Sequence, residues 1–189
     1  KTHVFEREHR GILTGSPITD IKFTLLTGKA HLKHTSGGDF REATYRAIRQ
    51  GLEQVENILL EPYYRFKISA DIEYMGRIIS DIQRLSGSFN VPEQNENKVV
   101  IQGRGPVSTF MDYSNEFNAF TKGKGSISLT YDGYDKCHNW EEVIESRGYN
   151  KDADIEYTST SIFCSKGQGY LVKWDKVKEE VHCDLEGLI

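Results

Sequence analysis

The segment Tyr63-Tyr64-Arg65-Phe66-Lys67-Ile68-Ser69 decides the fold of the middle of the chain. Every second side chain in it is apolar, which predicts a strand with one buried face. The residues that follow change to helical spacing, and Asp71 is placed to cap a helix that is expected to end at Gly87. The apolar positions of this helix are Ile72, Met75, Ile79 and Ile82.

The segments after this helix complete a regular order. Alternation predicts strands at residues 88–91, 98–103 and 126–132, with a polar loop between the first two. Pro106 stands where a second helix is expected to begin. The aromatic residues that follow it in the sequence have helical spacing, which favours their burial in the core. The order β-α-β-β-α-β predicts a ferredoxin-like split βαβ, an antiparallel sheet with both helices on one face.

The first 61 residues give a less complete pattern. Residues 1–10 look like the end of a helix, and the alternating run 18–26 predicts a half-buried strand. A helix is expected from Phe40 to about Asn57. Because one strand and two helices cannot bury both faces of a sheet, we interpret this unit as incomplete, as though strands before Lys1 were missing. The predicted buried face of the helix is Phe40, Ala43, Ala47, Ile48, Leu52 and Val55.

A long loop separates the predicted strand from the predicted helix: Gly28-Lys29-Ala30-His31-Leu32-Lys33-His34-Thr35-Ser36-Gly37-Gly38-Asp39. Such a length is unusual for a connection and suggests a functional loop. Asp39 and Glu42 are placed to form a capping box. Residues 22–49 hold six basic and two acidic side chains, although the whole chain has a net charge of -4. The loop therefore suits an anionic surface, with a merely solvated loop as the alternative.

Composition sets further limits. The chain has 189 residues, of which 37% are hydrophobic and 28% charged, as in ordinary folded proteins. No apolar run is long enough to span a membrane, and the charged start is not a signal peptide. The missing initial Met suggests a piece of a longer protein. Three widely spaced Cys argue for a reducing compartment. Beyond residue 133 we expect a short helix at 140–147, a strand near Ile162 and a closing helix at 171–182.

Several motifs match one family in order and spacing. The strand and loop at residues 18–40 and the run Leu59-Leu60-Glu61-Pro62 are two of them. Thr121-Lys122-Gly123-Lys124-Gly125 fits a turn T-[KQ]-G-[RK]-G before a last strand. Val143-Ile144-Glu145 and Asp175-Lys176-Val177 fit two short terminal helices. The helix pattern G-x-x-x-x-D-[LI]-x-R-x-x-G is matched by Gly76, Asp81, Ile82, Arg84 and Gly87.

With these motifs the chain resembles the C-terminal half of translation-factor GTPases of the elongation factor G class, and within it looks closest to the tetracycline-resistance ribosomal protection proteins. The resemblance implies an α+β chain in three parts. Residues 1–61 would be an incomplete ribosomal-protein-S5-domain-2-like unit, part of domain IV. Residues 62–133 would be domain V with its ferredoxin-like βαββαβ fold, and residues 134–189 a C-terminal helical extension.

The resemblance also implies a partner. In that family domain IV reaches the decoding centre of the small ribosomal subunit, and domain V lies near the GTPase-associated region of the large one. The loop would then be the tip that contacts 16S rRNA, in a monomeric cytoplasmic protein. The expected RNA-binding residues are Lys29, His31, Leu32, Lys33 and His34, supported by Arg41, Arg46 and Arg49, which lie outside the predicted buried face and are expected to be exposed.

The tip departs from the known resistance proteins, which carry Ser-Pro-Val where this chain has Leu32-Lys33-His34. A Lys-His tip is suited to phosphate rather than to displacing a drug. The alternative is therefore an elongation factor G-like translocation factor without drug-related activity.

The chain lacks the chemistry of a GTPase. No G-x-x-x-x-G-K-[ST] occurs, because Gly123-Lys124-Gly125-Ser126 lacks the upstream glycine. We therefore expect no catalytic residues and no cofactor here, and assign GTP and Mg to an upstream domain of the parent protein. Asp81 and Arg84 are interpreted as a surface ion pair.

Two readings from other classes stay open. Cys137-His138 and His182-Cys183, with Cys164 between them, would suit a metal- or redox-regulated protein if they met in space. The absence of C-x-x-C spacing favours ordinary buried thiols, and His31 with His34 lacks a third ligand, so no metal site is predicted. A free-standing interaction domain that uses the sheet of residues 62–133 is the other reading.

Overall fold

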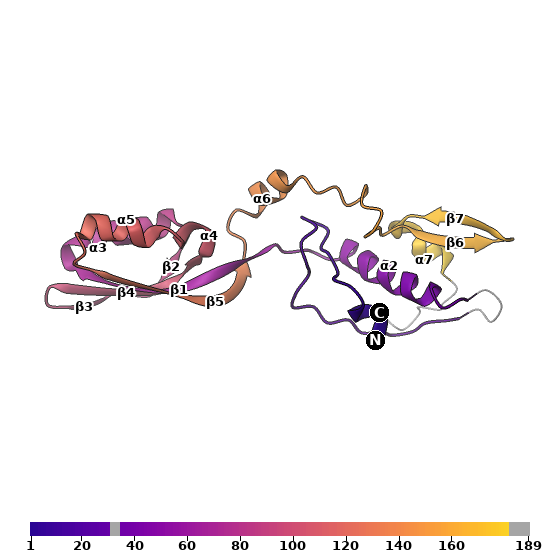
Figure 1. Ribbon diagram of the computed structural model, residues 1–189, viewed down its shortest axis with the longest axis horizontal. Helices are drawn as coiled ribbons and strands as arrows, with labels where there is room; N and C mark the ends of the chain where they lie inside the picture. Colours follow the sequence, from indigo (N-terminus) through magenta and orange to yellow (C-terminus); the bar gives the residue numbers. More distant parts are fainter. Residues whose placement is uncertain (31–34, 182–189) are drawn as a thin grey trace. The chain divides into compact units, whose positions relative to one another are not determined.

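The computed structural model describes residues 1–30 and 35–181 (Figure 1). The chain divides into two compact units. Unit 1 consists of Lys1–Asn57 and Glu141–Ile189, and unit 2 is Ile58–Trp140. This division differs from the predicted one, in which residues 134–189 follow as a third part. No helix in the described part of the chain combines the length and apolarity needed to cross a bilayer.

Unit 2 is built on an antiparallel sheet. Its central strand β1 (Leu60–Asp71) pairs with β4 (Lys98–Pro106) on one side and β5 (Ser126–Lys136) on the other. The short strands β2 (Ser88–Phe89) and β3 (Glu93–Asn95) both pair with β4. The strand order β2-β4-β1-β5 is that of a ferredoxin-like split βαβ, so the predicted fold class is confirmed.

The helices of unit 2 lie on one face of this sheet (Figure 1). They are α3 (Met75–Arg84) after the single turn η1 (Ile72–Tyr74), then α4 (Val107–Phe110) and α5 (Tyr113–Thr121). Phe66 of the sheet stacks on Phe110 with ring centroids 5.1 Å apart, and the predicted aromatic core is confirmed. The fully buried side chains include Phe66, Ile68, Ile78, Ile82, Val99, Ile101, Phe110 and Phe117.

The cap of the first helix of this unit was predicted wrongly. Asp71 precedes η1, but its side chain makes no capping hydrogen bond. It forms an ion pair with Lys98 instead, with 2.6 Å between Nζ and the carboxylate. The first turn after Asp71 is η1, and the α-helix begins at Met75. Asp81 and Arg84 do form the predicted ion pair, at 3.2 Å.

Unit 1 is built around α2 (Asp39–Glu53). The helix α1 (Thr2–Phe5) packs on it near the N-terminus, and α6 (Trp140–Arg147) matches the short helix expected there. The predicted closing helix at 171–182 is shorter than expected, because its first two residues belong to β7 (Gln168–Val172), which forms a hairpin with β6 (Ser161–Ser165). Lys166 and Gly167 link the two strands with φ of 52° and 80°, a turn geometry that suits tight hairpins. Only η2 (Trp174–Lys176) and α7 (Val177–Glu180) are helical in the described part of this region.

The predicted strand at residues 18–26 is absent from the described structure. Residues 18–30 contain no strand, and the nearest pairing is an isolated bridge between Arg10 and Pro17. A strand needs a neighbour to take its backbone hydrogen bonds, and none of the described segments supplies one. Leu25 is accordingly 88% exposed.

Helix α2 also differs from expectation. Gly38 is its N-cap, and the Asp39 carboxylate accepts a hydrogen bond from the Ser36 N–H at 2.7 Å, so the predicted capping box is wrong. Glu42 pairs with Arg46 one turn later. The buried residues are Ile48, Arg49, Gln50 and Leu52, whereas Phe40, Ala43, Ala47 and Val55 of the predicted face are exposed.

Candidate nucleic-acid interface

The basic segment is residues 21–30, the described part of the loop region before α2. All ten of its side chains are exposed, including Lys22 and Lys29. No carboxylate within the described ranges lies at ion-pair distance from either lysine. As far as residues 1–30 and 35–181 show, both ammonium groups are therefore open to an external anion, as a phosphate contact requires.

Four of the predicted tip residues are His31, Leu32, Lys33 and His34, and they lie outside the residues that the structure describes. Their assignment to the tip stays a prediction from the sequence.

Arg41 is exposed, but an acidic partner already holds it. Its Nε donates to the Glu6 carboxylate at 2.8 Å, and the Tyr45 hydroxyl donates to the same carboxylate at 3.1 Å. The hydrogen bond from Arg41, together with one from His3, lowers the pKa of Glu6 from 4.5 to about 2. At neutral pH this carboxylate is charged and offsets Arg41, so Arg41 offers less net charge to RNA than Lys29 does.

Arg46 connects helix α2 to the C-terminal part of unit 1. Its Nη1 pairs with Glu42, and its Nε donates to the backbone carbonyl of Thr160 at 3.0 Å. Gln50, one turn further on, donates to the Ser159 carbonyl at 2.8 Å. These contacts hold the helix beside the start of β6.

Arg49 is 3% exposed, so the expectation that it lies on the surface is wrong. Its guanidinium donates to the Arg10 carbonyl and to the Tyr149 hydroxyl, each at 2.7 Å. The side chain faces a cavity of about 10 Å³ that Arg7 and Tyr157 also line. That volume holds about one water molecule, which excludes a nucleotide. Arg49 therefore serves the packing of unit 1 and is not available to RNA.

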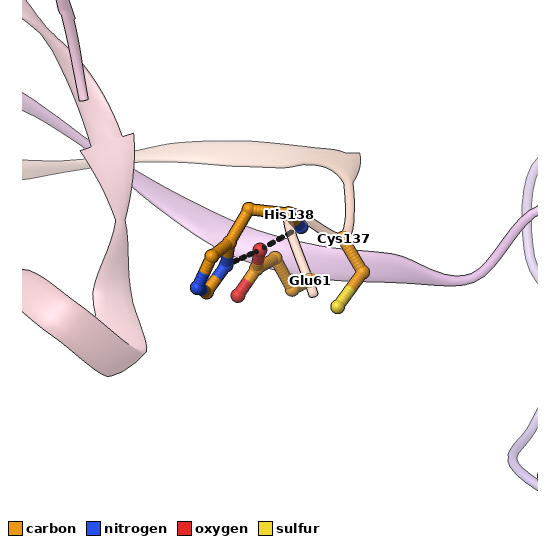
Figure 2. A group of neighbouring side chains, drawn as sticks. All are labelled: Glu61, Cys137 and His138. Atoms are coloured by element: carbon orange, nitrogen blue, oxygen red, sulfur yellow. Dashed lines mark hydrogen bonds and ion pairs between the residues drawn. The ribbon is translucent and has the colours of Figure 1, made fainter. Parts of the chain in front are cut away.

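A second group of polar side chains lies in unit 2, and we call it the Glu61 cluster. It consists of Glu61 at the start of β1 with Cys137 and His138 just after β5 (Figure 2). One Glu61 oxygen accepts hydrogen bonds from the His138 backbone N–H at 2.7 Å and meets the His138 ring Nδ1 at 2.6 Å. Its other oxygen accepts from the Ser108 hydroxyl at 3.1 Å.

Two members of the Glu61 cluster are buried. Glu61 is 8% exposed and Cys137 3%. Burial, aided by the nearby charge of Glu61, raises the pKa of the Cys137 thiol, so without a ligand the thiol keeps its proton at neutral pH. The thiol lies 3.5 Å from the side-chain oxygen of Asn139.

The sequence suggests other neighbours for Cys137-His138, namely Cys164 and His182-Cys183. Cys164 is exposed on β6 of the other unit, and His182-Cys183 lie outside residues 1–30 and 35–181. Sequence reasoning missed Glu61 as a neighbour. The signal was present in the strand pattern, because antiparallel β1 and β5 bring the start of one beside the end of the other.

Comparisons with known proteins agree on one family for most of the chain. Residues 1–56 match the family described as Elongation factor G, domain IV, and residues 58–142 match Elongation factor G C-terminus. The elongation factor G of Carsonella ruddii (strain PV) is 30% identical over 138 residues, which is 72% of this chain and 20% of that protein. The chain thus spans about a fifth of the length of this curated relative.

A solved protein from Thermus thermophilus gives a partial structural match. It shares 25% sequence identity with a TM-score of 0.46, over 51% of this chain and 15% of the other.

Proposed function

We propose that this elongation factor G-like C-terminal region binds the ribosome as part of a longer, GTP-dependent translation factor. The observation that carries the proposal is the order of the two family matches, domain IV at residues 1–56 and the C-terminus at 58–142. The exposed basic segment falls inside the domain IV match. In this family that domain is the part that reaches the decoding centre.

The proposed contact surface is the loop from Lys29 to His34. Lys29, His31, Lys33 and His34 would bind phosphates of 16S rRNA, with Leu32 beside them. RNA phosphates attract ammonium groups without regard to sequence, and the exposure of Lys29 supports this role. Arg41 and Arg46, each already paired with a carboxylate, would play a secondary part. Arg49 is left out because it is buried.

Unit 2 would lie near the GTPase-associated region of the large subunit, as domain V does in the family. GTP and Mg would be bound by an upstream domain of the parent protein, and hydrolysis would time release from the ribosome. A cytoplasmic, monomeric protein fits this role.

The class of translation factor is the finer question. The sequence motifs point to the ribosomal protection proteins, whereas the Leu32-Lys33-His34 tip favours a translocation factor without drug-related activity. Expression of the intact gene in tetracycline-sensitive cells separates the two. Growth at raised tetracycline supports protection, and unchanged sensitivity with full ribosome binding supports translocation.

The direct test of ribosome binding uses the 189-residue chain and 70S ribosomes, with affinity measured by sedimentation at several salt concentrations. Each phosphate contact removed should lower the slope of log affinity against log salt by about 0.7–0.9. We expect the double variant Lys29→Ala with Lys33→Ala to bind more weakly. Its slope should be lower by the amount expected for the loss of about two phosphate contacts.

A matched control removes two exposed lysines elsewhere in unit 1, Lys173→Ala with Lys178→Ala. The control changes the net charge by the same amount. An equal loss of affinity in both double variants would mean that overall charge causes the effect, and the tip would be removed from the proposal. For the intact gene product, binding with a non-hydrolysable GTP analogue but not with GDP would support the GTP-dependent cycle.

A further inference from the structure

We propose that the Glu61 cluster is a binding site for a divalent transition-metal ion of the zinc type. Neither the family matches nor the proposed ribosome contact assigns a role to these three residues.

The donor atoms are of the right kinds and close enough together. A carboxylate oxygen of Glu61, the thiol sulfur of Cys137 and a ring nitrogen of His138 all lie within 4.8 Å of one another. Zinc takes sulfur, nitrogen and oxygen ligands at about 2.0–2.3 Å, so donors around one ion lie about 3–4 Å apart. Figure 2 shows the Glu61 side chain between the other two.

The backbone holds the donors in place before any ion arrives. Glu61 belongs to β1, which pairs with β5 as far as Leu60 opposite Lys136. The next residue, Cys137, continues this pairing, because its N–H donates to the Leu59 carbonyl at 2.9 Å. The two segments that carry the ligands are therefore tied to each other by strand hydrogen bonds.

A further group orients the carboxylate. The Ser108 hydroxyl donates to the Glu61 oxygen that His138 does not use. Partners of this kind fix the direction of a ligand and often accompany metal sites.

The surroundings explain why three ligands are enough. Cys137 and Glu61 are buried, whereas the His138 side chain is 20% exposed. An ion can therefore enter beside the imidazole, and a water molecule can complete a tetrahedral set from that side. On binding, the ion would replace the hydrogen bond between Glu61 and the imidazole, and the thiol proton would pass to the solvent.

The alternative is a hydrogen-bonded latch without metal, in which Glu61 only ties the end of β5 to the start of β1. The two differ in the role of Cys137. A latch makes no use of the sulfur, whereas a metal site needs it as a thiolate.

The test titrates the 189-residue chain, purified without chelator, with Co²⁺ and then with Zn²⁺. We expect one Co²⁺ per chain, with a thiolate-to-cobalt charge-transfer band and tetrahedral d–d bands, both abolished by excess Zn²⁺. Cys137→Ser should remove the charge-transfer band. His138→Asn, at a partly exposed position where misfolding is not expected, should weaken Co²⁺ binding at least about tenfold.

Cys164→Ser and Cys183→Ser are the matched controls, and both should keep the full signal. The proposal is overturned if Co²⁺ gives no thiolate band, if the band survives Cys137→Ser, or if either control removes it. Circular dichroism of each variant confirms that unit 2 is folded.

Discussion

Arg49 and Tyr149 are joined by a hydrogen bond of 2.7 Å between a guanidinium nitrogen and the phenol oxygen. The two residues are 100 positions apart in the sequence. The Tyr149 hydroxyl in turn donates to Asp154 at 2.7 Å, which continues the chain of contacts. A buried arginine thus fastens α2 to the segment that follows α6, and this has a measurable consequence.

We predict that Arg49→Ala destabilises unit 1 by about 2–4 kcal/mol, because it removes hydrogen bonds to a buried charged group and leaves the Tyr149 and Arg10 oxygens without this donor. The loss in the free energy of unfolding is measured by urea unfolding of the full chain. Hydrogen exchange of the unit 1 amides is the readout. Arg41→Ala is the control and should have a smaller effect, because that ion pair is exposed to solvent. Equal losses in the two variants would contradict the structural role of Arg49.

Gly103 of β4 provides a second prediction, this time for unit 2. A Cβ added there would lie 2.0 Å from the backbone oxygen of Ser88 and 2.5 Å from the ring of Phe66. Since the backbone of β2 cannot yield easily, Gly103→Ala should destabilise unit 2 by about 2–3 kcal/mol or more.

The control for Gly103→Ala is Gly76→Ala in α3, where an added Cβ meets nothing within 4 Å. Alanine is the better helix former, so this variant should gain about 0.5–1 kcal/mol. Denaturant midpoints of both variants test the pair. A neutral Gly103→Ala would mean that β2 and β4 are spaced more widely than the structure shows.

The sequence was most informative where the partners of each element lie close along the chain. In unit 2 the long strands alternate and the helices carry apolar faces, so the pattern predicts the order of the main elements and much of the core, although Ile78 is buried in place of the expected Ile72 and β3 was not expected. Phe66, Phe110 and Phe117 are fully buried, as expected.

The sequence was less informative in unit 1, where the partners are distant. Arg49 was expected to be exposed, yet it is buried with Gln50, because their hydrogen bonds to Tyr149 and Ser159 satisfy these polar side chains. Helical periodicity cannot show such bonds. The strand expected near Ile162 is β6, whereas its partner β7 was missed, since Leu171 was assigned to the start of the closing helix.

The third prediction concerns pH. The pKa of Glu6 is lowered from 4.5 to about 2 by hydrogen bonds from Arg41 and His3. A carboxyl group whose pKa is lowered by folding stabilises the folded state at pH values above its ordinary pKa of 4.5. That contribution is lost as the pH falls from about 4.5 towards 2. We therefore expect the parent chain and Glu6→Gln to differ in unfolding midpoint at about pH 6 and to converge near pH 2.

Because the Glu6–Arg41 ion pair is exposed, added salt should reduce the difference in unfolding midpoint between the parent chain and Glu6→Gln. NMR titration of the Glu6 carboxyl measures the pKa directly. A midpoint near 4.5, or parallel pH profiles for the parent and Glu6→Gln, would show that the Arg41 contact does not persist in solution.

The last prediction separates two basic residues that composition treats alike. Lys29 is exposed and has no carboxylate partner in the described ranges, whereas Arg41 is held by Glu6. If phosphates of 16S rRNA bind the free charge, Lys29→Ala should lower the salt slope of ribosome binding by about 0.7–0.9, and Arg41→Ala should leave it nearly unchanged. The double variant Glu6→Gln with Lys29→Ala adds a sharper test. Freed from Glu6, Arg41 should recover part of the lost affinity if it lies within reach of the RNA, and an unchanged affinity would place Arg41 outside the contact.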